Sequence, residues 1–196
     1  MRASWLKTTE TYLKMICFAA SMGFFTQCLK HPRITGAVAP SSRFLAEKML
    51  KPIDFTSART IVELGAGTGV FTRKILKLMR KDASLDVFEI NPKFVKQLRS
   101  IKDARLAVHD IPAELLAKRV SKADAIISSL PLLALPAKQE HQILGVAKNS
   151  LKPGGLFVQF QYTPRGKKLL DEYFSEVSVD FTPLNIPPAF IYTCRN

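Results

Sequence analysis

Apolar and polar residues alternate along this chain with two periods, one typical of buried strands and one typical of amphipathic helices. Short apolar runs of about four to eight residues, bounded by turn formers, predict strands. We expect seven strands, over residues 60–64, 85–89, 105–109, 123–128, 156–162, 177–181 and 190–194. Apolar side chains recur at helical spacing over residues 43–50, 71–80, 91–99 and 136–150. This order predicts an α/β fold built on a doubly wound, mostly parallel seven-stranded sheet.

The first 30 residues show a different pattern. Apolar side chains form one helical stripe in the first half of this segment and cover the whole circumference from Met15 to Phe25. Because about eleven such residues are roughly half of what a helix needs to cross a bilayer, we expect residues 1–30 to form an amphipathic helix that lies on a membrane. One alternative is a signal peptide, which Glu10, Lys14 and the lack of a small-x-small cleavage site disfavour. A helix packed on the sheet of its own domain is the other.

Length and charge limit the possible classes of protein. A chain of 196 residues accommodates one ordinary domain and an extension. We divide it into the N-terminal helix (1–30), a lid or linker with the first helix (31–52) and the main domain (53–196). The formal net charge of +13 predicts attraction to a polyanion, either nucleic acid or an anionic membrane. The three cysteines are too few and too widely spaced for a disulfide framework or a zinc site, which favours a reducing cytoplasm.

A glycine-rich loop follows the first predicted strand, in the sequence Glu63-Leu64-Gly65-Ala66-Gly67-Thr68-Gly69. Alternating glycines remove side chains where the backbone turns sharply or where a ligand lies against it. A dinucleotide fingerprint would need glycine in place of Val70, and a P-loop would continue with Lys-Ser or Lys-Thr. The second predicted strand ends in Glu89, where a carboxylate can accept hydrogen bonds from both ribose hydroxyls. The loop therefore predicts a nucleotide-like ligand of another kind.

These residues resemble the E-x-G-x-G-x-G signature of class I methyltransferases, which use S-adenosylmethionine. Residues 36–42, 128–132, 155–160 and 187–190 further resemble the bacterial phospholipid N-methyltransferases, which are similar to ribosomal RNA adenine dimethylases. The resemblance implies a Rossmann-like fold, S-adenosylmethionine as cofactor, S-adenosylhomocysteine as product and no metal. The cofactor-binding residues that it implies are Glu63, Gly65, Ala66, Gly67, Gly69, Glu89, Ile90, Asp110, Ile111 and Ser128. Among them, Asp110 is expected to lie against the adenine amino group.

The segment Ser128-Ser129-Leu130-Pro131-Leu132 ends the fourth predicted strand, beside the first strand, where ligands meet in such sheets. Nucleobase amino methyltransferases usually carry an Asn or Asp, a proline and an aromatic residue here, which hold and stack the base. This chain keeps Pro131 and lacks the amide and the ring, which disfavours a nucleic-acid acceptor. The resemblance implies instead the stepwise methylation of phosphatidylethanolamine towards phosphatidylcholine. An RNA methyltransferase similar to the adenine N6-dimethylases and a non-catalytic binding module are the alternatives.

Methyl transfer to an amine depends on positioning and needs no covalent nucleophile. As the amine gains methyl groups it becomes a cation that donates few hydrogen bonds, for which an aromatic face is a suitable receptor. We expect Tyr162 to be this receptor, with Phe160 or Tyr192 as alternates. Ser128 is the second residue expected at the reacting groups.

The remaining predicted substrate residues lie near the expected lipid headgroup. Arg43, Arg165 and Lys167 are candidates to contact the lipid phosphate, the arginines by bidentate hydrogen bonds. Pro131 and Pro188 complete the predicted substrate site. We expect a phospholipid substrate, an anionic membrane surface and no nucleic acid as partners, with the protein cytoplasmic and peripheral on the inner face of the cytoplasmic membrane.

Overall fold

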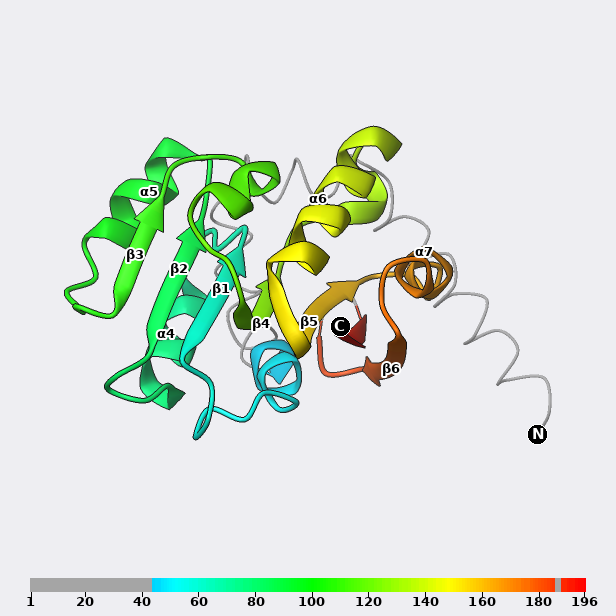
Figure 1. The fold of residues 1–196 in the computed structure, drawn as a ribbon, viewed down its shortest axis with the longest axis horizontal. Coiled ribbons are helices and arrows are strands. Elements are labelled where there is room, and N and C mark those ends of the chain that lie inside the picture. Colours follow the sequence, from blue (N-terminus) through cyan, green and yellow to red (C-terminus); the bar gives the residue numbers. More distant parts are fainter. Residues whose placement is uncertain (1–43, 186–187) are drawn as a thin grey trace.

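A twisted sheet forms the centre of the molecule and carries helices on both faces (Figure 1). The computed structural model describes residues 44–185 and 188–196. The strands are β1 (Thr60–Leu64), β2 (Ser84–Phe88), β3 (Leu106–His109), β4 (Ala123–Ser128), β5 (Leu151–Gln161), β6 (Glu176–Thr182) and β7 (Ala189–Arg195). Their order is β3-β2-β1-β4-β5-β7-β6, and neighbours are parallel except where β7 pairs with β5 and with β6. The predicted doubly wound, mostly parallel seven-stranded sheet is confirmed.

The helices bury their apolar sides against the two faces of the sheet. The elements are α4 (Val70–Leu78), α5 (Pro92–Arg99), α6 (Ala137–Ser150), α7 (Gly166–Asp171), the 3-10 helices η1 (Ala113–Lys118) and η2 (Leu132–Ala134), and a helix over residues 44–50. Side chains of α4, α5 and residues 44–50 form one core cluster, and those of η1, α6 and α7 form the other. Since strand side chains alternate between faces, Ile61 of β1 enters the first cluster while Val62 and Leu64 enter the second.

The start of β5 differs from the prediction. Residues 151–155 were expected to form a turn before the strand, yet β5 already begins at Leu151. The register with β4 passes from Ala123 opposite Leu151 to Ala125 opposite Leu156, so the residues between form a bulge. Gly154 adopts a left-handed φ of 75° there. The bulge is paired with the chain end, because Gly154 N–H donates to the Asn196 carbonyl and Asn196 N–H donates to the Gly155 carbonyl.

Several predictions concern residues 1–43, which lie outside the described residues. They are the amphipathic helix over residues 1–30, most of the lid over residues 31–52, and the role of Arg43. Residues 44–50 are helical, in agreement with the helix expected over 43–50. In the described residues, no helix combines the length and the apolar character needed to cross a membrane.

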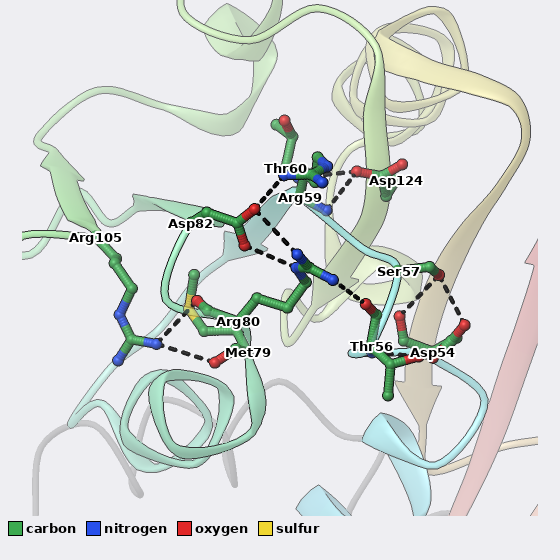
Figure 2. A network of polar contacts seen from close by, with 10 residues as sticks. All are labelled: Asp54, Thr56, Ser57, Arg59, Thr60, Met79, Arg80, Asp82, Arg105 and Asp124. Atoms are coloured by element: carbon green, nitrogen blue, oxygen red, sulfur yellow. Dashed lines mark hydrogen bonds and ion pairs between the residues drawn. The ribbon is translucent and has the colours of Figure 1, made fainter.

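Polar side chains tie together the amino ends of the central strands (Figure 2). The carboxylate of Asp124 accepts hydrogen bonds from the backbone N–H groups of Arg59 and Thr60, each at 2.8 Å, and pairs with Lys152 Nζ at 2.6 Å. Asp124 thereby connects β1, β4 and β5. Asp82 pairs with Arg80 at 2.7 Å and also with the guanidinium of Arg59. This network lies at the opposite end of the strands from the glycine-rich loop.

Candidate functional site

A cavity of about 540 Å³ lies at the carboxyl edge of the sheet, where β1 to β4 end. Its wall comes from the loops after these strands and from the amino-terminal parts of α5, η1 and α6. The residues that line it are Gly65, Gly67, Phe88, Glu89, Ile90, Asn91, Pro92, Phe94, Ile111, Pro112, Ala113, Glu114, Ser129, Leu130, Pro131, Leu135, Gln139 and Ile143. The structure thus brings Gly65, Gly67, Glu89, Ile90, Ile111 and Pro131 of the predicted site together around one space.

The glycine-rich loop between β1 and α4 exposes bare backbone to this cavity. Gly65 and Gly67 have left-handed φ values of 75° and 53°, which other residues adopt at a cost. A Cβ on Gly65 would lie 2.7 Å from Leu130 Cδ2, so the end of the Leu130 side chain would have to move to admit it. A Cβ on Gly67 would meet no described atom within 4 Å and would project into free space beside the cavity wall. The absent side chain of Gly67 therefore leaves room for a ligand rather than for protein. The other predicted loop residues, Ala66 and Gly69, are buried in the same turn.

Glu63 is a fully buried carboxyl at the end of β1. Its Oε2 accepts a hydrogen bond from Thr72 Oγ1 at 2.6 Å, while its Oε1 has no partner among the described residues. Burial raises the pKa of Glu63 to about 7, although the hydrogen bond from Thr72 acts in the opposite direction. The unpaired oxygen can accept a hydrogen bond from a cationic or N–H group that a ligand brings.

Glu89 occupies the position expected for a ribose acceptor, directly after β2. Its Oε2 accepts from Gly67 N–H and its Oε1 from Asn91 N–H, both at 2.8 Å. These bonds fix the carboxylate against the glycine-rich loop and in the cavity wall. Each carboxylate oxygen can accept further hydrogen bonds, so Glu89 can receive a pair of hydroxyl groups without losing its backbone partners.

Asp110 does not share this cavity. Its side chain is exposed, forms an ion pair with Arg99 Nη2 at 3.2 Å and lines a neighbouring depression together with Lys96. The next residue, Ile111, lines the cavity, as does Glu114 of η1, which accepts a 2.6 Å hydrogen bond from Gln139 Nε2. Glu114 is not among the predicted site residues, because no sequence motif marks this segment. The sequence indicates only that Glu114 follows the third strand, at the edge of the sheet where ligands bind.

The two serines at the end of β4 differ in their surroundings. Ser128 is fully buried, does not line the cavity, and lies with its Oγ 3.4 Å from the backbone N–H of Leu130, which donates to it. Ser129 lines the cavity with Leu130 and Pro131, and its buried Oγ has no hydrogen-bond partner among the described residues. Ser128 is the serine predicted at the site, yet Ser129 is the one that lines the cavity.

Of the predicted substrate residues that the structure describes, Pro131 lines the cavity and the others lie apart from its wall. Tyr162 is partly buried against the first core cluster and meets Phe160 edge to face, with ring centroids 5.5 Å apart. Tyr192 is fully buried and its hydroxyl donates to the Thr163 carbonyl at 2.8 Å, which leaves no open ring face for a headgroup. Arg165 is exposed just before α7.

Two further predicted positions flank the last helix and strand. Lys167 pairs with Asp171 at 2.7 Å on α7, and Pro188 is buried immediately before β7. The described residues contain no cluster of three or more histidine, cysteine or acidic side chains that could hold a metal ion.

Known proteins share both the sequence and the fold of this chain. A family model described as a methyltransferase domain matches residues 62–157. The ornithine lipid N-methyltransferase of Singulisphaera acidiphila is 32% identical over 180 residues, which cover 88% of this chain and 94% of that protein.

Solved methyltransferase structures have the same architecture. The N-methyltransferase NodS from Bradyrhizobium japonicum WM9, in complex with S-adenosylhomocysteine, gives a TM-score of 0.67 at 17% identity, over 80% of this chain and 88% of that chain. The Burkholderia thailandensis 1,6-didemethyltoxoflavin-N1-methyltransferase, with bound 1,6-didemethyltoxoflavin and S-adenosylhomocysteine, gives a TM-score of 0.69 at 14% identity, over 91% and 88%. At these identities the likeness shows a shared fold.

Proposed function

This chain belongs to the class I S-adenosylmethionine-dependent methyltransferases, and from that premise we propose that it methylates the headgroup amine of a membrane lipid. The observation that carries the proposal is the 32% identity to an ornithine lipid N-methyltransferase, an alignment that covers 94% of that protein. The end of β4 agrees with it, since Leu132 stands where a base-modifying enzyme would carry a stacking ring, and Leu132 is buried in the core.

The residues of the cavity fit S-adenosylmethionine. Glu89 would accept hydrogen bonds from the ribose hydroxyls, and Gly67 would lie against the ligand. Glu63 is fully buried behind the loop and does not line the cavity. When bound, the cofactor supplies an electrophilic methyl group on a positively charged sulfur. Leu130 and Pro131 line the cavity with apolar side chains, which would exclude water from a bound amine and cofactor.

The specific acceptor that we propose is phosphatidylethanolamine, methylated stepwise towards phosphatidylcholine. Ornithine lipid is a second candidate, favoured by the named relative. Both lipids present an amine at the membrane surface, so the same in-line geometry serves either. The headgroup contacts predicted for Arg43, Tyr162, Arg165 and Pro188 belong to this proposal.

We propose that the reaction takes place at the cytoplasmic face of the membrane. The apolar segment within residues 1–30 and the net charge of +13 support binding to an anionic lipid surface. A protein held at that surface meets its lipid substrate by diffusion in two dimensions, without extracting it from the bilayer.

Labelled methyl transfer tests this function. The full-length protein is incubated with methyl-labelled S-adenosylmethionine and with vesicles that contain phosphatidylethanolamine, vesicles that contain ornithine lipid, or RNA. We expect label in lipid, and loss of that label in Glu89→Ala, whose cofactor contact is removed. Label in ornithine lipid alone would keep the lipid amine and replace phosphatidylethanolamine as substrate. Label in RNA, or in no acceptor while the protein binds S-adenosylhomocysteine, would contradict the proposal.

A further inference from the structure

The outer side of the cavity mouth is apolar. Ile90 lines the cavity and is 68% exposed, so the cavity opens to the surface beside it. Pro92 and Pro112 also line the cavity and are exposed. In η2, directly after β4, Leu133 is 39% exposed and Ala134 is exposed too. We refer to Ile90, Pro92, Pro112, Leu133 and Ala134 together as the rim.

The rim comes from turns that lie at one edge of the sheet. Its residues follow β2, β3 and β4, and these strands stand close together in the order β3-β2-β1-β4. Because the four strands are parallel, the turns that follow them meet at the carboxyl edge, around the cavity. Exposed apolar side chains that gather around a cavity mouth indicate a surface that contacts another molecule.

Two lysines stand beside the rim. Lys93 lies in the first turn of α5 and Lys138 in the first turn of α6. Both are exposed, and neither side chain has an acidic partner within the part of the chain that the structure describes. The two acids of the cavity wall offset this charge only weakly at the surface, because Glu89 is 9% exposed and Glu114 is half-buried and hydrogen-bonded. The surface around the mouth is therefore both apolar and positively charged.

We infer that the rim rests on the surface of an anionic phospholipid bilayer, with the cavity mouth turned towards the lipid headgroups. The inference rests on the proposed function, because a lipid amine has to enter the cavity from the membrane. A surface of this kind buries its apolar side chains at the boundary of headgroups and acyl chains, while its lysines face anionic phosphates. The segment within residues 1–30 is proposed to supply most of the affinity, and the rim sets the orientation of the domain.

A second copy of this chain fits the rim less well than a bilayer does. Across a two-fold interface the same patch meets itself, so Lys93 and Lys138 of one copy would lie near the same lysines of the other. Like charges placed together at an interface oppose association. A second copy would also cover the mouth of the cavity, through which the substrate amine has to pass. An anionic bilayer offers both the apolar phase and the opposite charge.

Tryptophan fluorescence in the full-length protein tests which surface meets the bilayer. Trp5 is the single tryptophan of the chain, so Leu133→Trp in a Trp5→Phe background reports on the rim alone. Leu78→Trp is the matched control, because Leu78 is 47% exposed but ends α4, near the amino ends of the strands. The vesicles contain phosphatidylethanolamine and phosphatidylglycerol with brominated acyl chains, which quench tryptophan on contact.

We expect these vesicles to quench about half or more of the Leu133→Trp emission and less than about a tenth of the Leu78→Trp emission, because interfacial side chains lie about 5–10 Å inside the headgroup boundary. Affinity for S-adenosylhomocysteine shows that each variant is folded. Ala134→Trp, one residue further along the rim and also exposed, is the second reporter if Leu133→Trp does not fold.

A pair of charge variants tests the role of the lysines. Lys93→Ser with Lys138→Ser should weaken binding to the same vesicles by about tenfold, since each basic residue close to an anionic surface adds to the affinity. Lys77→Ser with Lys81→Ser is the control, because it removes the same charge from exposed lysines near the amino ends of the strands. That pair should stay within about threefold of the wild type, as salt screens charges far from the surface. Flotation at one fixed salt concentration measures both pairs.

Three outcomes would overturn the inference. One is a folded rim reporter that floats with the vesicles yet is not quenched, and another is an equal loss of vesicle binding in the two lysine pairs. The third is a blue shift of the rim reporter without vesicles that grows with protein concentration, which would place a second copy on the rim. None of these readouts depends on methyl transfer. Quenching at the rim with no label in any lipid would therefore support the membrane-facing rim and overturn the proposed function alone.

Discussion

The buried carboxyl of Glu63 makes the stability of the fold depend on pH. Its carboxyl is fully buried with one oxygen unpaired among the described residues, and burial raises its pKa to about 7. A carboxyl that stays protonated in the folded state while it ionises in the unfolded chain stabilises the fold only at low pH. The buried Glu63 carboxyl therefore costs stability at neutral pH.

Glu63→Gln tests this account through pH dependence. The folded pKa lies above the ordinary value of 4.5, so the wild type should lose stability as pH rises from about 4.5 to about 7. The variant lacks this titration. The difference in free energy of unfolding between variant and wild type should therefore shift in favour of the variant by roughly 2–3 kcal/mol between pH 5 and pH 8. Denaturant unfolding of both proteins at the two pH values, without cofactor, measures the difference. The exposed Glu172→Gln is the control and should follow the wild type. Parallel curves for Glu63→Gln and the wild type would contradict the account.

Substitution of Gly67 by alanine should affect both stability and ligand affinity. Alanine there must adopt a φ of 53° and would place its methyl group in the space beside the cavity. We expect Gly67→Ala to lose about 1 kcal/mol of stability from backbone strain and at least tenfold in affinity for S-adenosylhomocysteine. Gly154→Ala provides a control, since Gly154 has a φ of 75° with no atom near its Cβ position and lies at the other end of the strands. It should show the strain alone. Equal affinities in the two variants, measured by calorimetry, would exclude Gly67 as a ligand contact.

At the scale of elements, the sequence predicts what periodicity and glycine patterns encode. The strand over Thr60–Leu64 and the loop after it follow from an apolar run that ends in alternating glycines. Which serine at the end of β4 reaches the cavity does not follow, because Ser128 and Ser129 differ only in the direction of their side chains. The β5 bulge was also missed, because its backbone partner is Asn196, about forty residues away. Contacts distant in sequence leave no local signal.

Asp124 connects three strands of the sheet, and its removal should lower the free energy of unfolding. Lys152 and the N–H groups of Arg59 and Thr60 donate to its carboxylate, and these bonds outweigh burial and lower its pKa. We expect Asp124→Ala to cost roughly 1–3 kcal/mol at pH 7, since β1, β4 and β5 lose a shared acceptor. The cost should be present above pH 3.8 and shrink as pH falls through the lowered folded value.

Denaturant unfolding across this pH range measures the effect, and binding of S-adenosylhomocysteine should persist because the cavity lies at the other end of the strands. Asp54→Ala is the comparison, because the bonds of Asp54 stay within its own turn, to Thr56 and Ser57. A loss for Asp54→Ala as large as that for Asp124→Ala would show that the connection between strands adds nothing.

In the whole molecule, the two ends of the sheet have different roles. Ion pairs and hydrogen bonds at the amino ends of the strands hold the strands together (Figure 2), while the carboxyl ends carry glycines, unpaired oxygens and the cavity. The opposite ends can therefore be altered separately, which is why the variants above separate stability from binding. The cavity that we propose for the cofactor lies within the described residues. Membrane attachment, which we propose for residues 1–30, should therefore be separable in the same way.

Deletion of residues 1–25 tests that separation for the full protein. The deleted segment holds the apolar stretch from Met15 to Phe25, whose burial at the lipid surface should supply most of the affinity for vesicles. We expect the truncated protein to lose flotation with anionic liposomes while its affinity for S-adenosylhomocysteine, measured by calorimetry, stays within about twofold, since the cavity is built from later residues. The retained affinity also shows that the truncated protein is folded.

Neutral liposomes and raised salt separate the apolar from the electrostatic part of binding, because screening weakens only the latter. Equal flotation of the two proteins would assign membrane binding to the residues that follow position 25, whose basic side chains would then have to provide it.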